Sequence, residues 1–145
     1  MPTFSSKQVT DQMPIPSHGT ASSLKAAHFQ IVLGATAAAD VINLGYLPDY
    51  AVPTRVTVHH TAAITLITVG TTAAAAGLLA STAVVANTPL TGGIVATELF
   101  KNVGLGQRLI TATVGVGGGS AGTLNVLVEY LVEDQGVGYP FVAAT

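Results

Sequence analysis

The longest alternating stretch of the chain runs from Gly122 to Asp134. Because successive side chains of an extended strand point to opposite faces, one face collects apolar residues and the other a mixture. The apolar face holds Leu124, Val126, Val128, Tyr130 and Val132, and the mixed face holds Asn125, Leu127, Glu129, Leu131 and Glu133. A strand of this length without an interior Gly or Pro is predicted to lie in the centre of its sheet.

Five other segments have the composition and alternation of strands. They are Leu24–Leu33, Asp40–Leu47, Thr54–Thr61, Ala63–Val69 and Gln107–Val116. In Thr54–Thr61 the residues predicted to point inward are Val56 and Val58. In Ala63–Val69 they are Ile64 and Leu66, with Val69 as a further candidate. In Gln107–Val116 one face is shared by Ile110, Ala112, Val114 and Val116. Short strands separated by turn signals, with little helical periodicity, predict an all-β antiparallel sandwich or jelly roll.

A glycine run, Gly117–Gly119, followed by Ser120, separates the strand at Gln107–Val116 from the long strand at Gly122–Asp134. Glycine tolerates the backbone angles of a tight turn. The two strands are therefore predicted to form an antiparallel hairpin.

The middle of the chain is ambiguous. Residues Thr71–Thr91 favour either a short helix over Thr72–Ala80 or an inserted loop, and Gly77 weakens the helix. Ile94–Asn102 fits a helical turn or a strand, because short apolar runs are not resolved by pattern alone. We treat residues 71–103 as an inserted loop or short helical region of one domain.

Two terminal segments flank a predicted body at residues 24–134. Residues 1–23 contain several prolines and no periodicity, so they form either a disordered tail or an extended arm that lies on a neighbouring subunit. The anchors of such an arm would be Phe4, Val9, Met13 and Ile15. Residues 135–145 form a tail whose apolar side chains predict a docking contact: Tyr139, Phe141 and Val142.

Composition points to a surface that other chains cover. Hydrophobic residues make up 49% of the 145 residues and charged residues only 8%, against roughly 25% charged in ordinary soluble domains. Either Thr, Ser, Asn and Gly solvate the surface or other subunits bury much of it, and we expect a homo-oligomer. The net charge of -2 provides no basic footprint for nucleic acid.

A membrane span is not predicted. The stretch from Thr61 to Thr97 carries no charge and is long enough to span a bilayer, but it is rich in Thr, Ala and Gly and is interrupted by Pro89. It also lacks an aromatic belt and a flanking basic cluster.

No residue pattern predicts catalysis, a cofactor or a metal site. The four histidines are His18, His28, His59 and His60, and the adjacent pair points to opposite faces of a strand. His28 is interpreted as a half-buried strand residue. Glu129 and Glu133 share a face but fit solvated or interface carboxylates better than a catalytic pair. The glycine run leads into a strand and lacks the lysine of a phosphate-binding loop. We therefore expect a protein that is not an enzyme.

Three parts of the chain resemble the capsid decoration, or cement, proteins of tailed phages. They are the segment ADVINLGYLPDYAVPTRVTV, the Thr/Ala/Gly-rich middle, and the closing pattern RLITATVGVGGGSAGTLNVLVEYLVED. The resemblance covers about Leu24 to Asp134. It implies a β-sandwich body that is made in the host cytoplasm, trimerises and sits on the outer capsid surface of the virion. There it would clamp neighbouring copies of the major capsid protein, without a cofactor, nucleic acid or membrane as partner.

The residues expected at the oligomer or capsid interface are the anchors of the two terminal segments together with Leu127 and Leu131. Two alternatives stay open at this stage. One is another phage structural module, such as a head-completion or tail-fibre component. The other is a carbohydrate-binding β-sandwich, which the absence of Trp disfavours.

Overall fold

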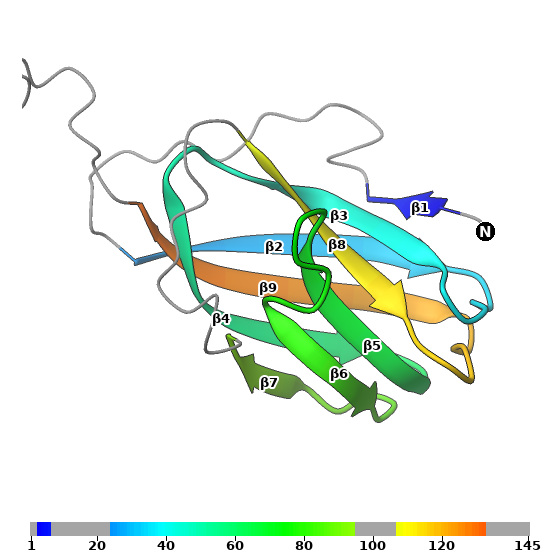
Figure 1. Cartoon of the computed structure of the whole chain (residues 1–145). Coiled ribbons are helices and arrows are strands. Elements are labelled where there is room, and N and C mark those ends of the chain that lie inside the picture. Colours follow the sequence, from blue (N-terminus) through cyan, green and yellow to red (C-terminus); the bar gives the residue numbers. More distant parts are fainter. Residues whose placement is uncertain (1–2, 7–23, 95–106, 133–145) are drawn as a thin grey trace, which may run out of the picture.

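Two β-sheets face each other across a hydrophobic core (Figure 1). The computed structural model describes residues 3–6, 24–94 and 107–132. Within these ranges it contains strands and no helix, which confirms the predicted all-β class. The strands are β1 (Thr3–Ser5), β2 (Leu24–Leu33), β3 (Val41–Leu47), β4 (Ala51–His60), β5 (Ile64–Thr71), β6 (Leu79–Val84), β7 (Leu90–Gly93), β8 (Arg108–Val114) and β9 (Gly122–Val132).

The first sheet has five strands in the order β1-β3-β8-β5-β6, and the second has four in the order β2-β9-β4-β7. Neighbouring strands are antiparallel except β1 and β3, which run parallel. The long strand β9 lies between β2 and β4, so its predicted central position is confirmed. No described helix is long and apolar enough to cross a bilayer.

The core lies between the sheets and is built by alternation. All five residues of the predicted apolar face of β9 are at most 2% exposed. Val56 and Val58 of β4 are fully buried, as predicted, and so are Ile42 and Leu44 of β3. At roughly 25 cal/mol per Å² of apolar surface removed from water, this burial is the main favourable contribution to folding.

The predicted hairpin of β8 and β9 is wrong, because the two strands belong to different sheets. The connection between β8 and β9 crosses from one sheet to the other and is held by backbone hydrogen bonds. The Gly115 N–H donates to the Leu66 carbonyl oxygen (2.8 Å). Thr36 and Gly119 each donate their N–H to the carbonyl oxygen of the other (2.9 and 3.0 Å). The strand ends at Val114, so Val116 lies in this connection and is 78% exposed instead of buried.

The proposed helix over Thr72–Ala80 is also wrong. A turn follows β5, and then β6 adds to the edge of the first sheet while β7 adds to the second. Leu78 and Leu79 are each 4% exposed, and the Leu78 N–H donates to the Val69 carbonyl oxygen (2.9 Å). A strand at this place extends a sheet and buries two leucines, which outweighs the local helical preference of the alanines.

Alternation fails once inside β5. Leu66, predicted to point inward, is half-exposed, whereas Ile67 is fully buried. The pairing of β5 with β6 shifts register between Ile64 and Ile67, and a bulge of this kind moves every later side chain to the opposite face.

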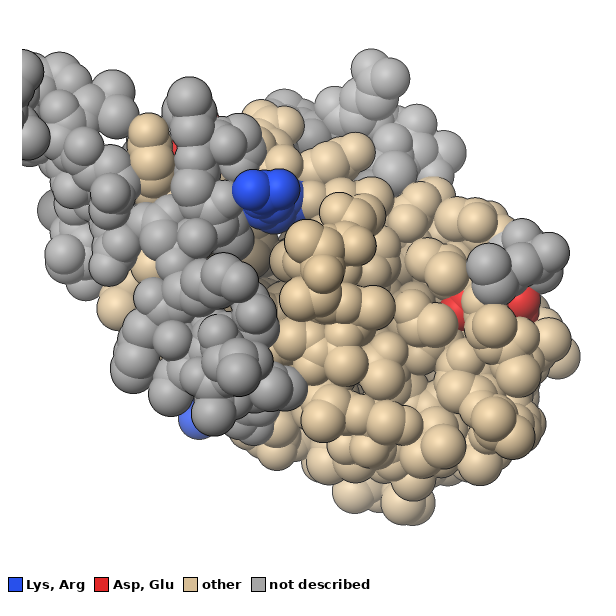
Figure 2. All heavy atoms as spheres, viewed as in Figure 1, with Lys and Arg blue, Asp and Glu red and all other residues tan. Residues whose placement is uncertain are grey.

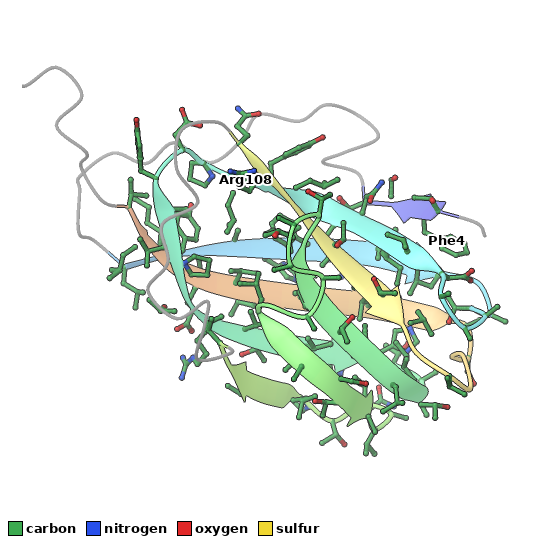
Figure 3. All side chains as sticks on the ribbon, in the orientation of Figure 1. Phe4 and Arg108 are labelled. Atoms are coloured by element: carbon green, nitrogen blue, oxygen red, sulfur yellow. The ribbon has the colours of Figure 1, made fainter. Side chains whose placement is uncertain are left out.

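The first residues of the chain contribute to its own body. β1 pairs with β3, and the ring of Phe4 is half-buried against the core; in Figure 3 it projects from β1 toward the sandwich. The Ser6 hydroxyl donates to the Leu44 carbonyl oxygen. Phe4 is therefore an anchor within the chain, and its contact with another chain stays a prediction. The remaining terminal anchors lie outside the described residues: Val9, Met13, Ile15, Tyr139, Phe141 and Val142.

Candidate interaction surface

The outer face of the β2-β9-β4-β7 sheet carries the two interface leucines that the sequence predicts in the body. Leu127 and Leu131 both lie on this face of β9 and are half-exposed. Leu127 sits between His28 of β2 and Thr57 of β4 in the strand register. We call this surface the outer sheet face.

Leu131 belongs to a larger apolar group than the sequence predicts. The register places it between Leu24 of β2, which is 62% exposed, and Val52 of β4, which is 2% exposed. The alternation of β2 indicates that Leu24 points outward, because it lies on the same face of the strand as the exposed residues Ala26, His28, Gln30 and Val32. Only the pairing of β2 with β9 shows that this face adjoins Leu131.

Polar side chains on the outer sheet face are bonded to each other. Asn125 Oδ1 accepts a hydrogen bond from Gln30 Nε2 (2.9 Å) and lies 3.0 Å from His28 Nε2. Because a carbonyl oxygen only accepts, the His28 contact requires the proton on Nε2. His28 is exposed, so the expectation of a half-buried residue is wrong.

The charges of Arg55 and Glu129 neutralise each other. Arg55 Nη2 lies 2.6 Å from Glu129 Oε1, and Nε donates to Oε2 at 3.1 Å. The hydrogen bonds to Glu129, followed by its negative charge, raise the pKa of the Arg55 guanidinium, which is ionised at all ordinary pH. The pair leaves no net charge on this part of the sheet.

A second surface lies at one end of the sandwich, where four connections meet (right side of Figure 1). We call it the loop end; it comprises residues 34–40, 61–63, 85–89 and 115–121. Backbone hydrogen bonds tie the connections together, for example from the Asn87 N–H to the His60 carbonyl oxygen (2.9 Å) and from the Ser120 N–H to that of Ala63 (3.1 Å).

The loop end is apolar and almost free of charge. Val85 is 64% exposed and Val116 is 78% exposed. Its sole charged residue is Asp40, which is 2% exposed and accepts a hydrogen bond from the Ala37 N–H (2.8 Å). Figure 2 shows blue Lys and Arg atoms at two places on this view, both away from the loop end. The sequence does not predict this surface, because Val116 continues the alternation of β8 and is therefore assigned to the buried face of that strand.

The titratable groups do not assemble into a reactive cluster within the described ranges. His59 is half-buried and His60 fully buried, on opposite faces of β4 as predicted. His60 Nδ1 lies 2.7 Å from the Ala62 carbonyl oxygen and 3.3 Å from the Ala62 backbone nitrogen. No group of three or more His, Asp or Glu side chains in these ranges is placed to hold a metal ion.

Comparison with known proteins identifies the fold. No model of a known protein family matches the chain, and no curated protein sequence matches it. A chain from the solved capsid of Ralstonia phage GP4 superposes with a TM-score of 0.77 at 22% identity, over 92% of this chain and 100% of that one. A chain from the capsid asymmetric unit of cyanophage Pam1 superposes with a TM-score of 0.59 at 20% identity, over 83% and 92%. The chain therefore shares its fold with chains of phage capsids.

Proposed function

We propose that the chain is a structural protein of a phage virion, which binds the outer capsid surface and stabilises the shell by bridging neighbouring major capsid protein subunits. The observation that carries this proposal is the likeness to a chain of the GP4 capsid along that chain's entire length, together with the likeness to a chain of the Pam1 capsid. In this role the protein catalyses no reaction, and after synthesis in the host cytoplasm it resides on the virion.

The chemistry of the surface supports a binding role. The outer sheet face, to which we assign the contact below, exposes Leu24 and Val32, two of the four large hydrophobic residues that are exposed among the described residues. Apolar side chains exposed to water contribute favourable binding energy when a partner covers them. The charges available for interfacial ion pairs are few, so apolar and backbone contacts supply most of the binding energy.

Bridging explains how such a protein stabilises a shell. Each copy that touches two capsid subunits adds contacts that must break before either subunit leaves. We propose a homotrimer, because three linked copies raise the effective concentration of each remaining contact once the first is made. Internal DNA pressure then works against more contacts than the shell has alone.

We assign the capsid contact to the outer sheet face around Leu127 and Leu131. A lysine at Leu127 places a charge in the middle of this face while leaving the core untouched, since the residue is half-exposed. The matched variant is Val116→Lys, which places the same charge on the loop end. We expect Leu127→Lys to weaken capsid binding at least about tenfold, a loss of about 1.4 kcal/mol, and Val116→Lys to leave it unchanged.

The experiment uses emptied, expanded capsids of the phage whose genome encodes the chain. Co-sedimentation measures binding, and calorimetry compares the capsid melting temperature with and without the protein. A higher melting temperature supports the proposal, whereas absence of binding or equal melting temperatures contradict it. If Val116→Lys weakens binding and Leu127→Lys does not, the function stands and the assigned surface is wrong.

Two other functions are distinguished by location and ligand. A head-completion or tail-fibre component would sit at the neck or tail, which immunogold labelling of virions detects. A carbohydrate-binding sandwich needs exposed aromatic side chains, and none of the aromatic residues in the described ranges is fully exposed. Binding to a glycan array without binding to capsids would favour that function.

A further inference from the structure

We propose that two copies of the chain pair through the edges of β2 that face away from β9, to which no other described strand is bonded, antiparallel and with a twofold axis at His28. The pair joins two four-stranded sheets into one continuous sheet of eight strands. The inference goes beyond the capsid role and does not depend on it, because it concerns a contact between two copies of the isolated protein.

The first observation is the open edge itself. β2 ends the order β2-β9-β4-β7, and within the described ranges β9 is the strand that pairs with it. All ten residues of β2 pair with β9 without a shift in register. The opposite side of such a strand presents a row of unpaired N–H and C=O groups, which is a template for another strand.

The other three edges of the described sheets are blunted in ways that proteins use against edge pairing. β1 has three residues and β7 has four, which is too short for a strong ladder. β6 pairs with β5 through two register shifts, so its edge is irregular. β2 contains neither Pro nor a bulge, and Lys25 is its single charged residue.

The register follows from the exposed side chains of β2. Leu24 is 62% exposed and Val32 is 79% exposed, and both point to the outer sheet face. His28 is halfway between them, so a twofold axis there sets Leu24 opposite Val32 of the second copy, and Val32 opposite that copy's Leu24. Cross-strand apolar pairs stabilise antiparallel sheets. Moving the axis by one residue along the strand loses both pairs.

The charges of β2 do not oppose this register. Lys25 falls opposite Ile31 of the second copy, so the two Lys25 residues are six positions apart along the paired strands. At about 3.4 Å per residue the separation is roughly 20 Å. This is beyond the screening length of about 8 Å at physiological salt. Like charges therefore do not meet across the pair.

The size of the contact predicts its strength. One strand edge with two apolar pairs is small beside the roughly 1,200 Å² at which stable interfaces begin. The association is thus reversible and depends on concentration. A twofold contact uses the same surface on both copies and does not fit inside a threefold ring. If the protein is the proposed trimer, the contact links one copy of a trimer to a copy of the adjacent trimer. If the protein does not form trimers, the contact produces a dimer.

Disulfide trapping tests the register directly, because the chain has no cysteine. In the variant His28→Cys the two cysteines lie opposite each other, with α-carbons about 4.5 to 5.5 Å apart. This distance is within the range of disulfides. In the control Gln30→Cys, on the same exposed face, the two cysteines are four positions apart, about 14 Å, and do not bridge. Circular dichroism confirms that both variants are folded.

We expect His28→Cys to form a cross-linked dimer under mild oxidation of the purified protein and Gln30→Cys to remain uncross-linked. Analytical ultracentrifugation provides the second readout. Val32→Lys should weaken self-association at least about tenfold through its lost pairing with Leu24. Val116→Lys, equally exposed but outside β2, should not. Equal cross-linking of the two cysteine variants, or unchanged association of Val32→Lys, overturns the proposal, and both results are independent of capsid binding.

Discussion

Gly70 and Ala74 approach each other so closely that Gly70 has no room for a side chain. A β-carbon at Gly70 would lie 2.0 Å from the carbonyl oxygen of Ala74. That oxygen is held in place, because it accepts hydrogen bonds from the N–H groups of Thr71 (3.0 Å) and Gly77 (2.9 Å). The turn between β5 and β6 is thus folded back against β5, and this contact directs the chain into β6.

The first prediction follows from this contact. Gly70→Ala should destabilise the protein by about 1–3 kcal/mol, because the backbone of the turn must move to admit the methyl group. Gly34→Ala is the matched control, since a β-carbon there meets nothing within 4 Å. The control should be neutral or slightly stabilising. Urea unfolding of both variants measures the difference, and equal midpoints would contradict the prediction.

The second prediction concerns Tyr130, whose ring is fully buried and whose hydroxyl has no hydrogen-bond partner among the described residues. Burial raises the pKa of this hydroxyl above its ordinary value. Its folded-state pKa therefore exceeds the unfolded one, near 10, so the stability of the fold does not depend on the ionisation of this group below that pH and falls as pH rises from there through the folded value.

Replacing Tyr130 by Phe removes both the buried hydroxyl and its titration. We expect Tyr130→Phe to be more stable by about 1 kcal/mol at neutral pH and to lose less stability above about pH 10. Tyr50→Phe, at a half-exposed position, serves as the control and should keep the alkaline loss. Unfolding free energies measured between about pH 7 and 11 decide the matter. A Tyr130→Phe variant with the unaltered alkaline profile would refute this account.

The third prediction contrasts Arg55 with its neighbour in sequence. The Arg55 side chain is 55% exposed, so its ion pair with Glu129 is weakened by solvent, and Arg55→Ala should barely change the melting temperature. Val56 is fully buried, and Val56→Ala should cost about 2 kcal/mol from two lost methyl groups and the cavity they leave. Thermal unfolding at low and high salt checks both, and a large, salt-sensitive loss in Arg55→Ala would contradict the expectation.

The fourth prediction concerns the ionic strength dependence of capsid binding. The candidate surfaces offer few unpaired charges, so the affinity should change less than about tenfold between about 50 and 500 mM salt. Association steered by charge would instead weaken steeply over this range. Co-sedimentation across a salt series measures the slope. A steep slope would leave the capsid role standing and refute this description of the interface.

The candidate site could be predicted in part. The alternation of β9 placed Leu127 and Leu131 on one outward face, and the structure confirms that placement, while their contact with a partner stays a prediction. Leu24 joined them only through the pairing of β2 with β9, which brings together residues 107 positions apart in the chain. Val116 was assigned inward because its pattern does not reveal that β8 ends at Val114.

The sequence by itself determined the buried face of β9 and the burial of Val56 and Val58 in β4, since alternation is a property of the extended backbone and needs no partner. It failed where the bulge of β5 interrupts the alternation. It also determined the all-β class and the scarcity of charge. Only the tertiary structure decided that β8 and β9 lie in different sheets. The apolar faces of the two strands are equally buried whether the strands pair as a hairpin in one sheet or face each other across the core from two sheets, so their side-chain pattern does not distinguish the two arrangements. That choice is made by backbone hydrogen bonds such as those between Thr36 and Gly119, which depend on positions 83 residues apart and not on local side-chain pattern.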